Sequence, residues 1–83
     1  MNKTTIQVLA FGIARDIIGT SSLDLEVREG LSVAELRQYI QQTYPQLAQL
    51  RSLTIAVNST YASDEQWIYP GDDVALIPPV SGG

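Results

Sequence analysis

The sequence predicts a two-layer α+β domain in which one main helix covers one face of a mixed sheet of four to five strands. Three observations support this fold class. The chain has 83 residues, enough for one small core. Its hydrophobic content of 45% is typical of a globular protein. Strand-like alternation occurs on both sides of one strong helix signal. We therefore expect a single domain over residues 1–83, with a globular body at about 4–78 and an extended, flexible tail at 79–83.

Two strands are expected before the helix. Residues 5–11 alternate with apolar side chains on both faces, as in a strand inside a sheet. Residues 23–27 alternate between apolar and charged side chains, so this strand should have one buried face and one face in water. The connection over residues 12–22 leaves room for a helical turn at 14–18.

The clearest local signal is the start of a helix at Ser32. The spacing Ser32-x-x-Glu35 is that of a capping box, and Leu31 before it can pack on Leu36 as a hydrophobic staple. Apolar residues at helical spacing continue the helix as far as Pro45, which ends it.

Two more strands should follow the helix. Residues 46–52 suggest a short helical turn, and residues 53–57 alternate as a third strand that ends in a polar run. Pro70-Gly71 is typical of a tight turn, and residues 74–77 form a last strand that a Pro-Pro pair ends. A ferredoxin-like arrangement would need a second helix of comparable strength. The order therefore favours the β-grasp arrangement, in which the first and last strands are parallel and adjacent in mid-sheet.

Composition excludes several classes of function. Five Lys and Arg against nine Asp and Glu give a net charge of −4, whereas nucleic acid and anionic membranes require a basic surface. There is no Cys and no His, so a thiolate, the commonest general base and the commonest metal ligand are missing, and we expect no metal site. No apolar run reaches the roughly 18–20 residues of a membrane span. The first residues contain no signal-peptide core, so we expect a cytoplasmic protein.

Polar and aromatic clusters inside the chain favour structural roles over chemistry. Adjacent carboxylates could bind a cation or act as acid and base, but in loops they more often serve solvation and turn hydrogen bonds. The clusters are the carboxylate pairs Asp64-Glu65 and Asp72-Asp73, the expected surface pair Arg15-Asp16, and the expected minor packing cluster of Trp67 and Tyr69. None of them resembles a catalytic set.

The chain end is the remaining candidate for chemistry. Two terminal glycines can be a frayed or trimmed end, but after a last strand stiffened by Pro-Pro they indicate a reactive terminus. A carboxylate becomes electrophilic once ATP converts it to an acyl-adenylate, from which a sulfur or amine nucleophile can displace AMP. Glycine has no Cβ, so such a tail can enter a narrow site on another protein, and proline reduces the entropy lost on insertion. The expected reactive residue is Gly83, and the expected inserting tail is Pro78, Pro79, Val80, Ser81 and Gly82.

Four segments together resemble one family over nearly the whole chain. They are Val8-Leu9-x-Phe11 with Arg15, Leu31-Ser32-Val33-x-x-Leu36, Ala56-Val57-Asn58, and the run from Gly71 to Gly83. On these segments the sequence resembles the small sulfur-carrier subunits of molybdopterin synthase, which are ubiquitin-like β-grasp proteins. The last seven residues, Ile-Pro-Pro-Val-Ser-Gly-Gly, are the most specific. Pro70 replaces a residue that is usually polar, a departure that affects only the turn.

The resemblance implies that catalysis occurs on other proteins. An E1-like enzyme would consume ATP to adenylate Gly83, and sulfur transfer would convert it to a thiocarboxylate. The tail would then insert into the large subunit of molybdopterin synthase, within a heterotetramer. There the thiocarboxylate would supply dithiolene sulfur to precursor Z, a cyclic pterin phosphate. The catalytic side chains would belong to the large subunit, and this chain would bind no cofactor of its own.

A docking face follows from the parity of the strands. Alternate residues of the first and last strands point to opposite faces, so one set should face the helix. The other set, which includes Leu9, Phe11, Ala75 and Ile77, should face away from it. The resemblance matches the partner-facing apolar positions of the family to Phe11, Tyr61 and Ile77.

Three other functions remain open. The chain could be a sulfur carrier for another pathway, of thiamin or cysteine type, although such relatives typically lack the Pro-Pro-Val stalk. It could be a ubiquitin-like protein modifier, although Lys3 is its single lysine and leaves little opportunity for lysine-linked chains. It could also be a passive binding module whose Gly-Gly end is incidental.

Overall fold

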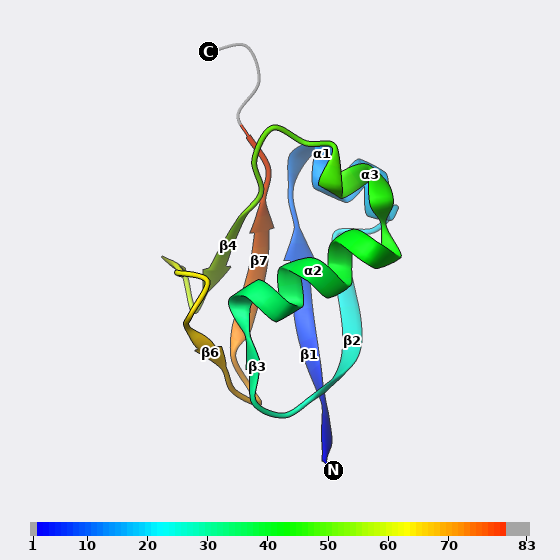
Figure 1. The fold of residues 1–83 in the computed structure, drawn as a ribbon. Helices are drawn as coiled ribbons and strands as arrows, with labels where there is room; N and C mark the ends of the chain where they lie inside the picture. Colours follow the sequence, from blue (N-terminus) through cyan, green and yellow to red (C-terminus); the bar gives the residue numbers. More distant parts are fainter. Residues whose placement is uncertain (1, 80–83) are drawn as a thin grey trace.

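Two layers make up the computed structural model, which describes residues 2–79: a five-stranded sheet, and helix α2 (Val33–Thr43), which lies across one face of the sheet (Figure 1). The other elements, in chain order, are β1 (Lys3–Ala10), α1 (Gly12–Ile18), β2 (Ser22–Arg28), β3 (Leu31–Ser32), α3 (Pro45–Ala48), β4 (Thr54–Val57), β5 (Thr60–Tyr61), β6 (Trp67–Ile68) and β7 (Asp73–Ile77). The predicted fold class, a mixed sheet covered by one main helix, is confirmed.

The first and last strands of the chain form the centre of the sheet. Its order is β2-β1-β7-β4-β5, and β1 and β7 run parallel, with Val8 opposite Val74. The β2 and β4 strands are antiparallel to their neighbours β1 and β7. Parallel neighbours need a long crossover connection, which α2 supplies by passing over the sheet. Since β1 and β7 are parallel, both point toward the same end of the molecule, opposite the N-terminus (Figure 1).

Helix α2 begins at the predicted capping box. The backbone N–H of Glu35 donates to the Ser32 hydroxyl at 3.2 Å, and the Glu35 carboxylate accepts from the backbone N–H of Ser32 at 3.0 Å. That backbone hydrogen bond is the main reason why the pKa of Glu35 lies below its ordinary value. The inner face of α2 buries Leu36 and Ile40 completely against the sheet. The helix stops at Thr43, and Pro45 begins α3 at a position where proline is well tolerated.

The hydrophobic core lies between the two layers. Its largest fully buried side chains come from the helices α2 and α3 and from the strands β1, β4 and β7: Val8, Val33, Leu36, Ile40, Leu47, Ile55, Val74 and Leu76. No polar or charged side chain of residues 2–79 is buried, so burial of apolar surface is the dominant stabilising contribution.

Several elements differ from the sequence-based expectations. The turn expected at 14–18 is a complete helix, α1, which buries Ala14 and ends at Gly19 in the left-handed conformation. The two-residue strands β5 and β6 were not expected. The β5 strand pairs with β4, and β6 pairs with β3 in a separate two-stranded sheet. Strands of two residues contain too little alternation for a sequence pattern to reveal them.

One local prediction about side chains was wrong. The ion pairs among residues 2–79 are Lys3–Glu26, Arg28–Glu35 and Arg37–Asp64, so Arg15 and Asp16 do not form the expected pair. Adjacent residues of α1 project in different directions, which separates the two charges.

None of the helices in the described part of the chain has both the length and the apolar composition needed to cross a lipid bilayer.

Candidate functional site

The two faces of the central strands have different partners. The predicted inner set is buried beneath α2, with Ile6 at 2% exposure and Val8, Val74 and Leu76 at 0%. On the opposite face Leu9 is 37% exposed, and Ala75 and Ile77 are partly exposed. The predicted parity of β1 and β7 is therefore confirmed. No element of residues 2–79 covers this outer face as α2 covers the inner one (Figure 1).

An apolar groove of about 420 Å³ lies on this outer face. We call it the sheet groove. It is lined by Leu9, Phe11, Ala56, Ser59, Tyr61, Asp73, Val74, Ala75 and Ile77. The three residues predicted for partner docking, Phe11, Tyr61 and Ile77, thus come from three separate parts of the chain and line one groove. Their role in docking remains a prediction.

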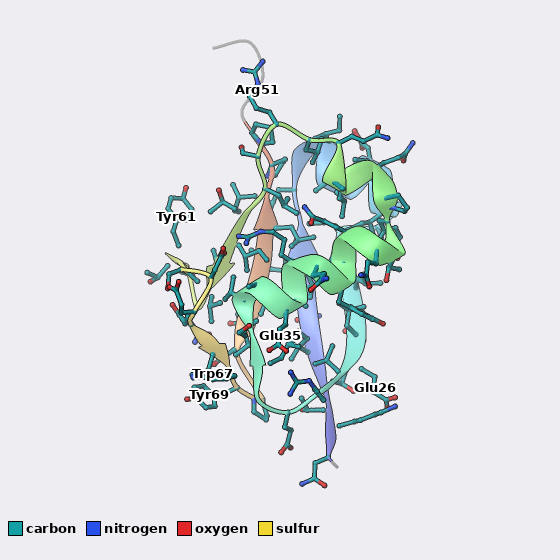
Figure 2. The ribbon with its side chains drawn as sticks, viewed as in Figure 1. Glu26, Glu35, Arg51, Tyr61, Trp67 and Tyr69 are labelled. Carbon is teal, nitrogen blue, oxygen red and sulfur yellow. The ribbon has the colours of Figure 1, made fainter. Side chains whose placement is uncertain are left out.

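Large aromatic side chains in the groove are exposed to solvent. Phe11 is 49% exposed and Tyr61 is 73% exposed, and Figure 2 shows Tyr61 projecting away from the body beside β4. Exposed aromatic rings combine a large apolar area with few rotatable bonds, which is the composition that protein interfaces favour. Exposed apolar residues on one concave surface can therefore bind an apolar partner surface.

A tight hairpin holds Tyr61 in this position. Asn58 and Ser59 occupy the turn between β4 and β5, with φ angles of 53° and 69°. Two successive residues with positive φ are typical of the type I′ turn, which matches the twist of the adjoining strands. The hairpin pairs Tyr61 with Ala56, so that the ring lies next to the sheet groove.

Hydrogen bonds fasten this hairpin to the turn before β7. The Asn58 side-chain amide donates to the Asp72 carboxylate at 3.1 Å, and the other oxygen of that carboxylate accepts from the backbone N–H of Tyr69 at 2.8 Å. Tyr69 and Asp72 are also joined across Pro70-Gly71 by a backbone hydrogen bond of 3.0 Å, and Gly71 has φ 90°, so the predicted turn is confirmed. The Asp72 carboxylate has a structural role here, as expected.

The remaining carboxylate pair also has a structural contact. Asp64 forms an ion pair with Arg37 of α2, which ties the loop before β6 to the helix. Nowhere in residues 2–79 do three or more potential metal-ligating side chains gather into a group that could hold an ion.

The base of the predicted tail lies at one end of the sheet groove. Ile77 is the last residue of β7 and pairs with Thr54, after which the chain continues into Pro78 and Pro79, both partly exposed. Val80, Ser81, Gly82 and Gly83 lie outside the described residues. The reactive glycine and the inserting tail therefore remain predictions.

The minor packing cluster expected of Trp67 and Tyr69 remains a prediction. Trp67 is 52% exposed and Tyr69 is 62% exposed, and both lie near β6, apart from Tyr61 (Figure 2). Within β6 the side chains alternate, so Ile68 faces inward at 4% exposure while Trp67 faces outward.

Sequence reasoning also missed the polar part of the groove. Ser59 and Asp73 line it together with the apolar residues. The signal for Ser59 was available in the Asn-Ser-Thr run, because Asn and Ser favour tight turns. Asp73 gave no such signal, since adjacent Asp residues occur in many turns.

Comparison with known proteins gives one family and a consistent fold. The ThiS family matches residues 8–83. The molybdopterin synthase sulfur carrier subunit of Arabidopsis thaliana is 33% identical over 83 residues, covering 99% of this chain and 86% of that protein. The human protein of the same description is 34% identical over 82 residues, covering 94% of this chain and 93% of that protein.

Solved structures share the arrangement of strands and helices. A putative molybdopterin converting factor, subunit 1, from Pyrococcus furiosus superposes with a TM-score of 0.83 at 26% identity, covering 93% of this chain and 99% of that chain. SAMP1 from Haloferax volcanii superposes with a TM-score of 0.80 at 20% identity, covering 95% of this chain and 99% of that chain. At that identity the second likeness supports the fold alone.

Proposed function

The chain belongs to the ThiS family, and on this basis we propose that it is a sulfur carrier subunit of molybdopterin synthase. The observation that carries the proposal is the extent of the similarity. It spans nearly the whole chain in relatives of that description, and the family match runs through Gly83. Chemistry at the chain end also agrees with a body that has no Cys and no His.

We propose that the carbonyl carbon of Gly83 is the reacting centre. Its carboxylate attacks the α-phosphorus of ATP and releases pyrophosphate, which gives an acyl-adenylate. Hydrosulfide then adds to the carbonyl and expels AMP with loss of a proton, and the product is a thiocarboxylate with one oxygen replaced by sulfur. An E1-like activating enzyme performs these steps, and the ATP binds to that enzyme.

The sheet groove supplies the docking surface in this proposal. Phe11, Tyr61 and Ile77 bury their apolar surface against the large subunit of molybdopterin synthase, and against the activating enzyme at an earlier step. Pro78 and Pro79 then direct the last four residues into the partner. Those four residues can extend roughly 13–14 Å at about 3.3–3.6 Å per residue. In a heterotetramer, the thiocarboxylate donates its sulfur to precursor Z to build the dithiolene.

The first experiment measures the intact mass of the chain after co-expression with an E1-like activating enzyme. We expect a gain of about 16 Da, the difference between sulfur and oxygen. The thiocarboxylated chain is then mixed with a large synthase subunit and precursor Z, and dithiolene product is assayed. A chain with one alanine appended after Gly83 is the matched control; it should melt at the same temperature and form no product.

Other results would identify other functions. Covalent adducts with target lysines would indicate a protein modifier, and an unchanged mass would indicate a passive module. A thiocarboxylate that yields no dithiolene with the large subunit would indicate a carrier for another pathway. If the alanine-extended chain forms product without being trimmed, the carbonyl carbon of Gly83 is not the reacting centre and the proposal is wrong.

A further inference from the structure

The two central strands separate at the point where the tail begins. Ala10 and Leu76 form the last pair of the parallel ladder between β1 and β7. Beyond that pair β1 turns into α1, whereas β7 continues through Ile77 toward Pro78. Ile77 keeps a partner only on its other side, Thr54 of β4. The start of α1 and the segment before β4 are the continuations of the two strands that flank β7, and contacts from them can determine the position of Pro78.

Gly12, the first residue of α1, supplies such a contact. A methyl group placed on its Cα would lie 3.2 Å from Cγ of Pro78. Optimal separations between carbon atoms are about 3.5–4.0 Å, so the pyrrolidine ring already occupies part of the space that a side chain would need. The ring of Pro78 thus lies directly against the backbone of Gly12.

The contact has two requirements that glycine meets. Gly12 has φ +55°, in the left-handed region that residues with a Cβ rarely adopt. Three other glycines also have positive φ, namely Gly19, Gly30 and Gly71, but a Cβ built on any of them would meet nothing within 4 Å. Among the four glycines of residues 2–79 with positive φ, Gly12 alone has a neighbour that a side chain would displace.

Gly12 also connects the tail base to the sheet groove through one peptide bond. Phe11 precedes it, is extended with φ −124° and ψ 156°, and lines the groove. The carbonyl of Phe11 accepts from the backbone N–H of Ala14 at 3.1 Å, and Ala14 is fully buried, so the start of α1 is fixed to the core. This fixed turn therefore places Phe11 in the sheet groove and the next residue, Gly12, beside the Pro78 ring.

We propose that Gly12 is a positioning residue for the tail: its backbone seats the Pro78 ring and so fixes the direction in which the tail leaves the body relative to the sheet groove. The inference rests on the proposed function, because the direction matters only if a docked body must deliver its last carbonyl to a partner. Gly12 does not touch the reacting atoms. It acts through Pro78, because a Cβ at position 12 would force the Pro78 ring to move by a few tenths of an ångström.

The effect should appear in the rate of the chemical step and not in docking. The sheet groove is unchanged when the tail leaves in another direction, so binding of the body is preserved. Delivery of the reacting carbonyl is impaired, and small misplacements of reacting groups can cost about 10–100-fold in rate. A lower kcat with an unchanged KM is the signature of an interaction that matters only after binding.

The test compares four variants in the adenylation of the chain by the activating enzyme, with kcat and KM measured from pyrophosphate release. Gly12→Ala introduces the methyl group. Gly19→Ala is the matched control, because it places the same methyl group at positive φ just after the other end of α1, with open space around it. Pro78→Ala removes the ring atom that the methyl group would meet. The double variant Gly12→Ala/Pro78→Ala tests whether the two residues act together.

We expect Gly12→Ala to lower kcat about tenfold with little change in KM, whereas Gly19→Ala keeps the kcat of the unmodified chain. In the Pro78→Ala background, Gly12→Ala should have little further effect. Equal kcat for Gly12→Ala and Gly19→Ala, a loss confined to KM, or the same loss in both Pro78 backgrounds would each overturn the inference while leaving the proposed function intact. If the unmodified chain is never adenylated, the proposed function fails and the inference fails with it.

Discussion

Asn58 and Asp73 are joined by two hydrogen bonds that link the β4–β5 turn to the start of β7. The backbone N–H of Asp73 donates to the Asn58 side-chain carbonyl at 2.9 Å, and the backbone N–H of Asn58 donates to the carbonyl of Asp73 at 2.7 Å. The pair lies beside the sheet groove, which Asp73 lines. These hydrogen bonds thus hold the β4–β5 hairpin against the start of β7 at the side of the sheet groove.

Substitution of Asn58 should therefore lower stability. Asn58→Ala loses the side-chain hydrogen bonds and places alanine at a φ of 53°, so we expect the free energy of unfolding to fall by about 1–2 kcal/mol in urea titrations. Asn58→Gly separates the two causes, because glycine tolerates this φ but makes no side-chain hydrogen bond. If Asn58→Gly is as stable as the native chain, the hydrogen bonds to Asp72 and Asp73 contribute nothing.

The capping box makes stability depend on pH. Hydrogen bonding to the backbone of Ser32 lowers the pKa of Glu35 below its ordinary value, with smaller lowering contributions from the Ser32 hydroxyl and Arg28. Because the folded-state pKa lies below the unfolded one, this stabilisation is complete above the unfolded pKa and disappears as pH falls through the folded pKa. The stability difference between the native chain and Glu35→Gln should shrink as pH is lowered through that range. Urea titrations at several pH values measure it, and a constant difference would contradict the assignment.

The Ser32 side of the same box can be tested at neutral pH. Ser32→Ala removes the hydroxyl that accepts from the backbone N–H of Glu35, and loss of such a cap costs about 1 kcal/mol of unfolding free energy. Ser32→Thr retains the hydroxyl and should recover most of the loss. Equal stability of the alanine and threonine variants would show that the hydroxyl does not cap the helix.

Phe11→Asp tests the sheet groove as a docking surface. We expect the variant to fold, because Phe11 is half exposed, and to bind the large subunit and the activating enzyme at least about tenfold more weakly, as a charge replaces an apolar contact. Tyr39→Asp is the matched control: Tyr39 is an aromatic residue of α2 with 42% exposure that does not line the groove. Calorimetric titration gives both affinities, and unchanged affinity of a folded Phe11→Asp chain would defeat the docking assignment.

Substitutions of the neighbouring β7 residues Leu76 and Ile77 should affect stability and partner binding differently. Leu76 is fully buried in the core, so Leu76→Ala should cost about 2–5 kcal/mol of unfolding free energy, the range for a cavity left by a buried leucine. Ile77 is partly exposed and lines the groove, so Ile77→Ala should cost less stability and weaken partner binding more. Thermal unfolding and titration on the same pair of variants decide this. If Ile77→Ala lost more stability than Leu76→Ala and Leu76→Ala weakened binding more, the assignment of Leu76 to the core and Ile77 to the groove would be wrong.

Most of the fold was predictable because its main signals are local. The capping box at Ser32, the Pro70-Gly71 turn and the alternation in β1 and β7 each report a short-range preference, and the structure confirms all three. The parity of β1 and β7 also gave the correct outer face. What escaped prediction depends on tertiary pairing: β6 exists only because β3 lies opposite it, with Leu31 paired to Ile68.

The candidate site was predictable only in part, for a related reason. Phe11 and Ile77 follow from parity, but the position of Tyr61 depends on the hairpin at Asn58 and Ser59, which parity does not describe. The contact between Gly12 and Pro78 joins residues at opposite ends of the chain, and only the folded arrangement brings them together. The matching of Tyr61 to a docking position came from family resemblance alone.

Strand β1 lies between β2 and β7 in the sheet, and β7 is synthesised long after the other two. The sheet therefore cannot be completed until β7 is available. The nascent chain can form the β1–β2 hairpin and α2 early, but the middle of the sheet stays open until residue 77 has left the ribosome. During translation the edge of β1 that faces away from β2 has no partner, and β7, the strand that precedes the tail, is the one that pairs with it. An activating enzyme that recognised the closed sheet would therefore bind only chains in which β7 has already paired with β1.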